Sequence, residues 1–367
     1  MSLAYVTATS MRSASGDTHD TLKDVYEKKS RLKTYDDIVK DKTVCIGKFS
    51  EDESFNALLI QSVQEVLSSC NLDNYNETLL LVGSSVGGMA TTEKILFKDK
   101  SYERINPQKH TINAIASLLD TEFNFQANRS YSTACTSSAN ALKTAKQLIE
   151  LGAYKNVLVV GADEICATTI FGFSSLGILS DEICTPFKNE RKGMNVAEGI
   201  GVLLLQDRPT QDAVVLCGAG ASSDAFHIAN PDPSSAGAIT AIQNALCDAK
   251  IDAKDIGYIN AHGTGTQAND ACEANAILEI FPKEVAVSSS KSIIGHTLGA
   301  AGAIEAVLCV ESLKQGLLPP QLDCSDNEKE INLLSQKEAK VIQYAMSNSF
   351  AFGGNNVSLV FGVQNEG

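Results

Sequence analysis

The sequence contains no tryptophan, only five histidines and eight prolines, and no hydrophobic stretch as long as a membrane-spanning helix. Because such a helix needs about 20 consecutive apolar residues, we expect no transmembrane segment. The N-terminus also lacks a basic stretch followed by an apolar core, so no signal peptide is predicted. Together these absences favour a cytoplasmic protein.

Basic residues are also fewer than acidic ones. The 30 lysines and arginines are outnumbered by 44 aspartates and glutamates, which gives a formal net charge of −14. An acidic surface repels phosphate groups, so we expect neither a nucleic acid nor an anionic membrane as partner.

The ten cysteines include no C-x-x-C pair, and no Cys/His pair has the spacing of a structural zinc site. We therefore expect no metal. A chain of this size without a secretory signal is expected to keep its thiols reduced. Most of the cysteines should then be small buried hydrophobic residues, and a functional cysteine must be recognised by its surroundings.

What the sequence does contain is an alternation of strand-like and helix-like runs. Strands are predicted for residues 78–88, 155–164, 199–207, 214–224, 256–266, 284–292 and 355–362, and helices for 138–154, 233–250 and 299–316. The charged residues 13–56 predict a solvated helix and loop segment. The alternation indicates an α/β protein, and the 367 residues allow two cores. The polar stretch 205–214 predicts a boundary between halves 1–208 and 209–367.

One cysteine has unusual surroundings. In "STACTSSANAL" (Ser132–Leu142), Cys135 lies between small and hydroxylic residues where a helix is expected to begin, with Ser132 and Thr133 as candidate caps. A helix N-terminus favours a thiolate, so the pKa of Cys135 should be lowered, and the free N–H groups there could stabilise an oxyanion. A packed cysteine in a tight turn explains the same residues, and both interpretations remain open.

Two histidines lie beside glycines at the ends of predicted strands. His262 stands in "NAHGTGTQAND", and His296 stands in "KSIIGHTLGAAGAIE", five residues after Lys291. Glycine lets a ligand approach the backbone closely. Either histidine alone is more often structural, but the two together with Cys135 resemble the parts of a covalent catalytic site.

Three further residues stand near these motifs. Lys291 lies near the end of a predicted strand, where it either extends outward or is paired inside, and Glu305 on the following helix is its candidate partner. In "SNSFAFGGNN", Phe352 precedes two glycines and is a candidate gate. The alternative is that Phe350 and Phe352 are ordinary core aromatics.

Four segments, in this order, resemble the signature segments of the β-ketoacyl-acyl carrier protein synthases of the elongating, Cys-His-His type: Thr133–Leu142, Asn260–Asp270, Lys291–Glu305 and Ser347–Asn356. Residues 185–205 resemble the middle segment of that family. The resemblance implies the thiolase-like fold, in which two pseudo-symmetric α/β halves form five layers, α-β-α-β-α. It also implies a homodimer that works with acyl carrier protein.

The resemblance assigns a role to each candidate residue. Cys135 would be the nucleophile that accepts the acyl chain, while His262 and His296 would serve the decarboxylation of malonyl-carrier protein. Lys291 would hold the local charge network, and Phe352 would gate the acyl pocket. The backbone N–H groups of Cys135 and Phe352 would form the oxyanion hole.

Glu305, Asp270 and Glu273 would support these residues, Glu305 as the partner of Lys291 and the other two as structural acids after the His262 loop. The implied enzyme is an acyltransferase, a 3-oxoacyl-[acyl-carrier-protein] synthase of type II fatty acid biosynthesis, which extends an acyl group on Cys135 by two carbons. No cofactor or metal is expected.

Three alternatives remain. The stretch between Gly88 and Cys135 is shorter than the family usually has, which is compatible with a ketosynthase of a dedicated polyene or polyketide-like pathway. A non-catalytic chain-length factor typically lacks the cysteine that is present here. A degradative thiolase would need a second cysteine near the C-terminal glycines, and "FAFGGNN" has none.

Because carrier proteins are acidic, this acidic chain needs a local basic patch to bind one. The sequence offers Lys28, Lys29, Arg31, Lys33, Lys188, Arg191 and Lys192 as candidates.

Overall fold

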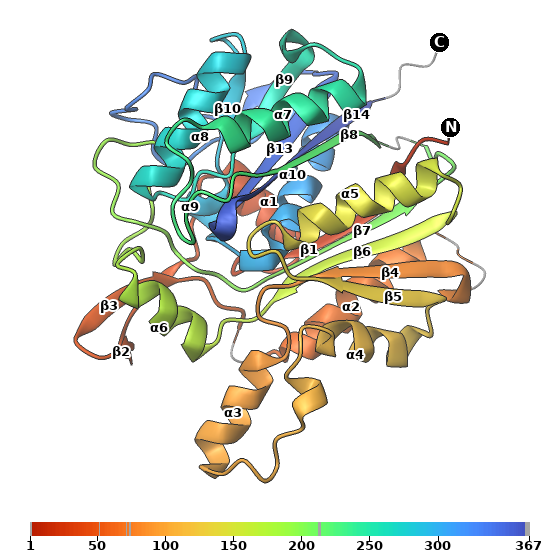
Figure 1. Ribbon diagram of the computed structural model, residues 1–367, viewed down its shortest axis with the longest axis vertical. Coiled ribbons are helices and arrows are strands. Elements are labelled where there is room, and N and C mark those ends of the chain that lie inside the picture. Colours follow the sequence, from red (N-terminus) through yellow and green to blue (C-terminus); the bar gives the residue numbers. More distant parts are fainter. Residues whose placement is uncertain (1, 51, 71, 73–74, 212–213, 364–367) are drawn as a thin grey trace.

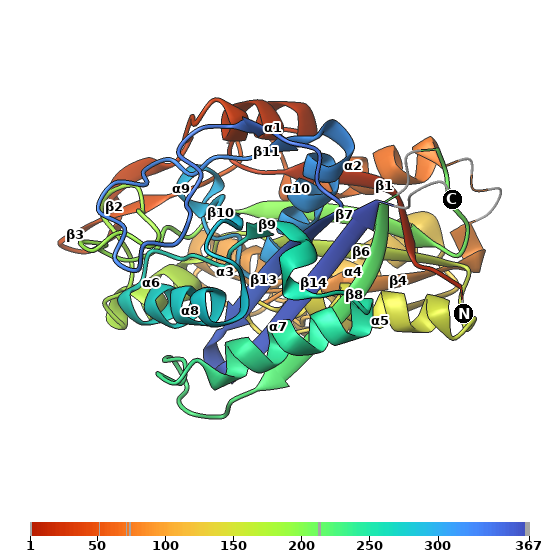
Figure 2. The ribbon, with the colours of Figure 1, turned by 90° about the horizontal axis from the view of Figure 1, so that it is seen from above.

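A ten-stranded sheet that is made of two similar five-stranded parts forms the centre of the molecule in the computed structural model (Figures 1 and 2). The structure describes residues 2–50, 52–70, 72, 75–211 and 214–363. The first part comprises β1 (Tyr5–Arg12), β4 (Thr78–Gly83), β5 (Ala127–Tyr131), β6 (Asn156–Asp163) and β7 (Gly199–Gln206). The second comprises β8 (Val214–Ser223), β9 (Ile256–Asn260), β10 (Ala286–Ser288), β13 (Tyr344–Ala351) and β14 (Asn355–Val363).

The two parts repeat one topology. The strand orders are β1-β7-β6-β4-β5 and β8-β14-β13-β9-β10. In each part the first two pairings are antiparallel and the last two are parallel. The parts join where Tyr5 and Val6 of β1 pair with Val215 and Val214 of β8. This correspondence confirms the predicted pseudo-symmetry.

Helices form three layers around the two parts of the sheet. The helices are α1 (Thr18–Tyr26), α2 (Phe55–Ser69), α3 (Met89–Asp99), α4 (Ala114–Phe123), α5 (Ser137–Glu150), α6 (Ala167–Ser175), α7 (Ala236–Ala249), α8 (Gln267–Ile280), α9 (Lys291–Ile294) and α10 (Ala301–Gln315). Helices α5 and α10 pack between the parts, α2 and α4 cover the outer face of the first, and α7 and α8 cover that of the second. The five-layered thiolase-like arrangement is therefore confirmed.

The central position of α10 explains its composition. Every residue from Ala301 to Val310 is buried, because sheets or helices surround this helix on all sides. A helix in that place cannot be amphipathic, and small residues let its neighbours approach closely. Cys135 lies just before the N-terminus of α5, and His296 lies shortly before the N-terminus of α10.

The predicted strands and helices each overlap the corresponding element, but the sequence patterns predicted neither β1 nor the short pair β11 (Leu317–Leu318) and β12 (Glu338–Ala339), and they missed four further strands. These are β5, whose sequence "ANRSY" is half exposed at the sheet edge, β13, and the hairpin of β2 (Lys33–Val39) and β3 (Lys42–Ile46). The prediction of a solvated segment for residues 13–56 is partly wrong, since Val44 and Ile46 are buried in one hydrophobic cluster with Ile170 of α6. Lys291 begins the short helix α9 instead of ending a strand.

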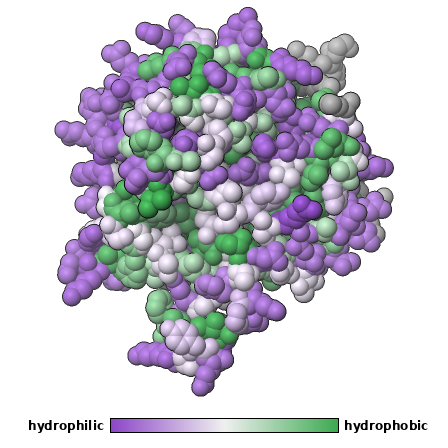
Figure 3. Space-filling model, in the orientation of Figure 1, coloured by the Kyte–Doolittle hydropathy of each residue, from purple (hydrophilic) through white to green (hydrophobic). Residues whose placement is uncertain are grey.

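The surface shows one projecting element. Helix α3 extends from the body at the bottom of Figure 1, and the same projection carries apolar and polar residues side by side in Figure 3. Phe97 and Tyr102 there are exposed. Among the residues that the structure describes, no helix is both long and apolar enough to cross a bilayer.

Candidate active site

Cys135 lies in the tight turn between β5 and α5. Ala134, just before it, has a left-handed backbone (φ 51°), which turns the chain sharply into the helix. The N-cap is Thr136, and not Ser132 or Thr133 as the sequence suggested. The N–H groups of Thr136 and Ser137 donate to the carbonyl oxygens of Thr133 and Ala134 (3.3 and 3.1 Å), so the turn uses donors that a thiolate could otherwise have used.

His296 faces this cysteine from the other half of the molecule. Its Nε2 lies 3.0 Å from Cys135 Sγ. The Leu298 N–H donates to His296 Nδ1 (3.2 Å), so in the neutral ring the proton resides on Nε2 and points at the sulfur. Gly295 has φ 79° and no room for a Cβ against Ala197, which explains the glycine before this histidine.

His262 is oriented in the same way by a lysine. Lys291 Nζ, which can only donate, lies 3.4 Å from His262 Nδ1, so the His262 proton also resides on Nε2. Lys291 forms a buried ion pair with Glu305 of α10, as the sequence suggested. Because removing one partner of such a pair typically costs about 3–5 kcal/mol, this pair fixes the lysine firmly.

One cavity of about 280 Å³ brings the predicted residues together. Cys135, His262, His296, Phe350 and Phe352 all line it. The rings of His262 and His296 are perpendicular, with centroids 5.3 Å apart, and the ligating atoms of Cys135 and the two histidines lie within 4.8 Å of one another. Two donors and a nucleophile thus converge on a space where a thioester could sit.

The comparisons with known proteins agree with this geometry. Residues 47–211 match the family described as "Beta-ketoacyl synthase, N-terminal domain", and residues 213–325 match its C-terminal domain. The 3-oxoacyl-[acyl-carrier-protein] synthase 2 of Rhizobium meliloti is 35% identical over 310 residues, which are 77% of this chain and 73% of that protein. The chain belongs to the β-ketoacyl synthase family. It is accordingly an acyltransferase-type enzyme.

Other ketosynthases resemble this one over most of its length. The 3-oxoacyl-[acyl-carrier-protein] synthase 2 of Synechocystis is 34% identical over 82% of this chain and 78% of its own. Among solved structures, a ketosynthase in complex with its chain length factor from Xenorhabdus doucetiae matches with a TM-score of 0.91 and 32% identity over 99% of this chain and 98% of that chain. A β-ketoacyl synthase from Burkholderia phymatum, 23% identical over the whole of both chains, shares the fold with a TM-score of 0.87.

The thiol of this ketosynthase does not have the lowered pKa that the sequence suggested. Burial raises the pKa of Cys135 to about 12, and although Lys291 lowers it, the nearby carboxylates of Glu305 and Asp163 oppose that effect. The resting site therefore holds a neutral thiol beside a neutral imidazole. Cys166 also stands at a helix N-terminus, as the N-cap of α6, so helix placement alone does not distinguish Cys135; the two histidines do.

The pKa values of both histidines lie well below 6.5. Burial is the main cause, and the charge of Lys291 lowers both values further. For His262, the neighbouring His296 adds to the effect. We predict that both rings remain neutral, with the proton on Nε2, at pH 6. Unfolding frees each ring to take up a proton, so these two groups make the free energy of unfolding fall as the pH drops below about 6.5. Nitrogen-15 NMR of histidine-labelled enzyme, assigned with H262N and H296N, measures the ring states. A midpoint at or above pH 6.5 for either ring would contradict this prediction.

The proton positions on His262 and His296 also indicate whether the site suits a zinc ion. Among the described residues, Cys135, His262 and His296 form the cluster with metal-ligand spacing. A metal-bound histidine usually donates its other ring N–H to a carboxylate or carbonyl oxygen. Here the other ring nitrogens face donors, Lys291 Nζ and the Leu298 N–H. The remaining ring nitrogen, Nε2 of each histidine, is consequently a hydrogen-bond donor, which suits an oxyanion and not a metal ion.

Glu273 and Asp270 support the loop that carries His262. Glu273 accepts the N–H groups of His262 and Gly263, both at 2.8 Å, and burial raises its pKa to about 7. Asp270 accepts the N–H groups of Thr264 and Gly265 (3.0 and 3.1 Å). Both carboxylates therefore hold the backbone from behind, as expected, and do not line the cavity.

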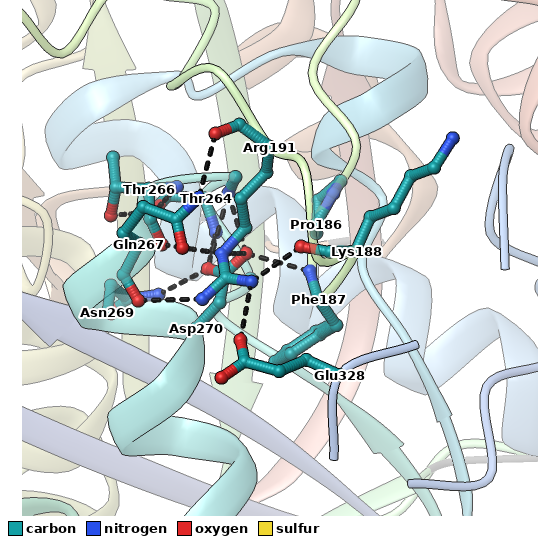
Figure 4. Close-up of polar contacts among 12 residues, drawn as sticks. Pro186, Phe187, Lys188, Arg191, Thr264, Thr266, Gln267, Asn269, Asp270 and Glu328 are labelled. Atoms are coloured by element: carbon teal, nitrogen blue, oxygen red, sulfur yellow. Dashed lines mark hydrogen bonds and ion pairs between the residues drawn. The ribbon is translucent and has the colours of Figure 1, made fainter. Parts of the chain in front are cut away.

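Arg191 ties this loop to the segment that precedes β7. Figure 4 shows its guanidinium between Asp270 (3.5 Å) and Glu328 (2.8 Å). It also donates to the carbonyl oxygens of Thr266 and Gln267. Because Arg191 is buried and its donors are used internally, its suggested role in binding a carrier protein is wrong. Lys192 is exposed, but it already pairs with Glu182 (3.3 Å).

Sequence reasoning missed Asp163, a fully buried carboxylate at the end of β6. It accepts hydrogen bonds from the Ser84 hydroxyl and from the N–H groups of Ser85, Val86 and Gly299. The available signal was a carboxylate that follows the apolar run "VLVVGA" at the carboxyl end of a strand, where functional groups gather in α/β sheets.

Proposed function

We propose that this enzyme catalyses the decarboxylative Claisen condensation of malonyl-acyl carrier protein with an acyl group held on Cys135, as a 3-oxoacyl-[acyl-carrier-protein] synthase of type II fatty acid biosynthesis. The observation that carries the proposal is the convergence of the Cys135 sulfur with ring nitrogens of His296 and His262, all within 4.8 Å of one another in one cavity. The names of the curated relatives agree with it.

In the first step, the sulfur of Cys135 attacks the thioester carbonyl of an acyl-carrier protein. Because the resting group is a thiol, its proton must leave as the bond forms, and the departing carrier thiolate takes it up. The products are the acyl-cysteine and the free thiol of the carrier. We propose that the backbone N–H groups of Cys135 and Phe352, both residues of the cavity wall, stabilise the oxyanion of this step.

In the second step, malonyl-carrier protein enters, and its thioester carbonyl accepts hydrogen bonds from Nε2 of His262 and of His296. Carbon dioxide leaves, and the electrons of the broken C–C bond form an enolate that the two donors stabilise. The enolate carbon attacks the acyl-cysteine and expels the Cys135 thiolate, which takes up a proton. The product is a 3-oxoacyl-carrier thioester two carbons longer.

Lys291 and Phe352 serve these steps without forming a covalent bond. The Lys291–Glu305 pair keeps the His262 proton on Nε2 by donating to Nδ1. Phe352 packs edge-on against Phe173, with ring centroids 6.1 Å apart, ahead of Gly353 and Gly354. Gly354 has φ 74°, and a Cβ there would overlap the Asp224 carboxylate. We propose Phe352 as the gate between the acyl pocket and the malonyl entrance.

A second candidate is the same chemistry in a dedicated polyene or polyketide-like pathway. It is supported by the Xenorhabdus ketosynthase, which is 32% identical over 99% of this chain and whose solved structure is a complex with a chain length factor. In either pathway we propose that the enzyme is a cytoplasmic homodimer and that its partner is acyl carrier protein. We also propose that the boundary between its two halves lies at residue 208.

A primer panel distinguishes the two pathways. We predict that the purified enzyme, given malonyl-carrier protein, extends saturated acyl-carrier primers at least as fast as polyunsaturated ones, because the first proposal requires ordinary fatty acid intermediates. Product masses measured over a series of chain lengths give both rates. Turnover of polyunsaturated primers alone would instead establish the second candidate.

A further inference from the structure

A single buried carboxylate connects the two halves of the catalytic pair. Asp163 ends β6 beneath the active site, and its two oxygens together hold two segments that are distant in sequence. Oδ1 accepts the N–H of Val86 at 2.9 Å and the Ser84 hydroxyl, so it holds the loop after β4. Oδ2 accepts the N–H of Gly299 at 2.6 Å, so it holds the turn before α10.

The loop after β4 supports the cysteine. Ser85 lies in this loop, its N–H donates to Asp163 Oδ2 at 2.9 Å, and its hydroxyl donates to the carbonyl oxygen of Ala134 at 3.0 Å. Ala134 is the left-handed residue directly before Cys135. Asp163 therefore fixes the position of the sulfur through Ser85 and Ala134.

The turn before α10 supports the histidine. Gly299 follows Leu298, whose N–H donates to His296 Nδ1 and thereby places the His296 proton on Nε2. Anchoring the Gly299 N–H to Asp163 holds the adjacent Leu298 amide in its orientation. A Cβ at position 299 would come within 2.8 Å of Asp163 Oδ2, so this contact also requires glycine.

On these contacts, and resting on the proposed condensing activity, we infer that Asp163 is a positioning residue that holds Cys135 and His296 in register across the two halves. Its charge acts on the sulfur as well, because a carboxylate near Cys135 disfavours the thiolate. Burial keeps the pKa of Asp163 raised, to about 6, despite the four donors that face it. A carboxylate is thus retained at a place where burial disfavours its charge.

The test compares D163N with E198Q. Glu198 is a matched control, since it is a buried carboxylate that accepts the N–H groups of Phe49 and Ile165 and lies outside the catalytic cavity. The amide of D163N turns one acceptor into a donor against these N–H groups, so we expect kcat for malonyl-carrier decarboxylation to fall about ten- to hundredfold, with KM changed less than about threefold. The pH midpoint of Cys135 alkylation by iodoacetamide, followed by mass spectrometry, should shift downward. E198Q should change neither quantity.

Several outcomes would overturn the inference. If D163N keeps the kcat and the alkylation midpoint of the wild type and loses only thermal stability, Asp163 is purely structural. If D163N does not fold, S85A provides the milder test, because it removes only the contact to Ala134 and should slow acyl transfer to Cys135 several-fold; an unchanged rate would refute the link. A wild-type enzyme that alkylates normally but does not condense would refute the proposed function instead.

Discussion

Cys135→Ala should abolish condensation, with a loss of at least about a thousandfold, because removal of a covalent nucleophile leaves no acyl-enzyme to extend. Decarboxylation of malonyl-carrier protein should continue, since both Nε2 donors remain. Release of 3-oxoacyl product and release of carbon dioxide, measured on the same samples, separate the two effects.

The matched control is Cys166→Ala. Cys166 is a buried cysteine at the N-terminus of α6, but among the described residues its sulfur contacts Met89 and Thr169. This variant should condense at close to the wild-type rate. Equal losses in both variants would show that the cysteines act through folding and that Cys135 is not the nucleophile.

His296→Ala should slow malonyl decarboxylation by about 10²- to 10³-fold, because it removes one of two donors aimed at the developing enolate oxygen. Transfer of an acyl group to Cys135 should remain measurable, since the resting thiol does not rely on His296 as a base: its Nε2 already carries the proton. Single-turnover assays of each half-reaction report the two rates.

His110→Ala serves as the control, because His110 is exposed in the segment between α3 and α4, away from the cavity. It should leave both half-reactions unchanged. If His296→Ala abolished acyl transfer and left decarboxylation intact, the roles assigned to the two steps would be reversed.

Much of the fold follows from local patterns. The buried strands β4, β6 and β7 are continuous apolar runs, and α5 has helical periodicity with Gly152 as its end signal. The strands that the sequence did not predict lack such patterns. Strand β5 is a polar edge strand, and β13 mixes serines with aromatics although most of it is buried. Their pairing is set by tertiary context, which short-range periodicity does not contain.

The site shows a similar division. Five residues were predicted to act together, and the structure places them in one chain of contacts across the two halves. They are Cys135, His262, His296, Lys291 and Glu305. The raised pKa of Cys135 was not predictable, because it depends on burial and on carboxylates that are distant in sequence, among them Asp163. The proton positions on both histidines likewise depend on the Leu298 amide and on Lys291, and only the folded geometry reveals these contacts.

The most direct test of the account is intact-protein and peptide mass spectrometry during one catalytic cycle. After incubation with a saturated acyl-carrier thioester, the enzyme should gain one acyl mass, located on the peptide that contains Cys135. Addition of malonyl-carrier protein should then remove that mass and release a 3-oxoacyl thioester two carbons longer. Acylation of a different residue, or an acyl-Cys135 that malonyl-carrier protein does not discharge, would contradict the proposed reaction.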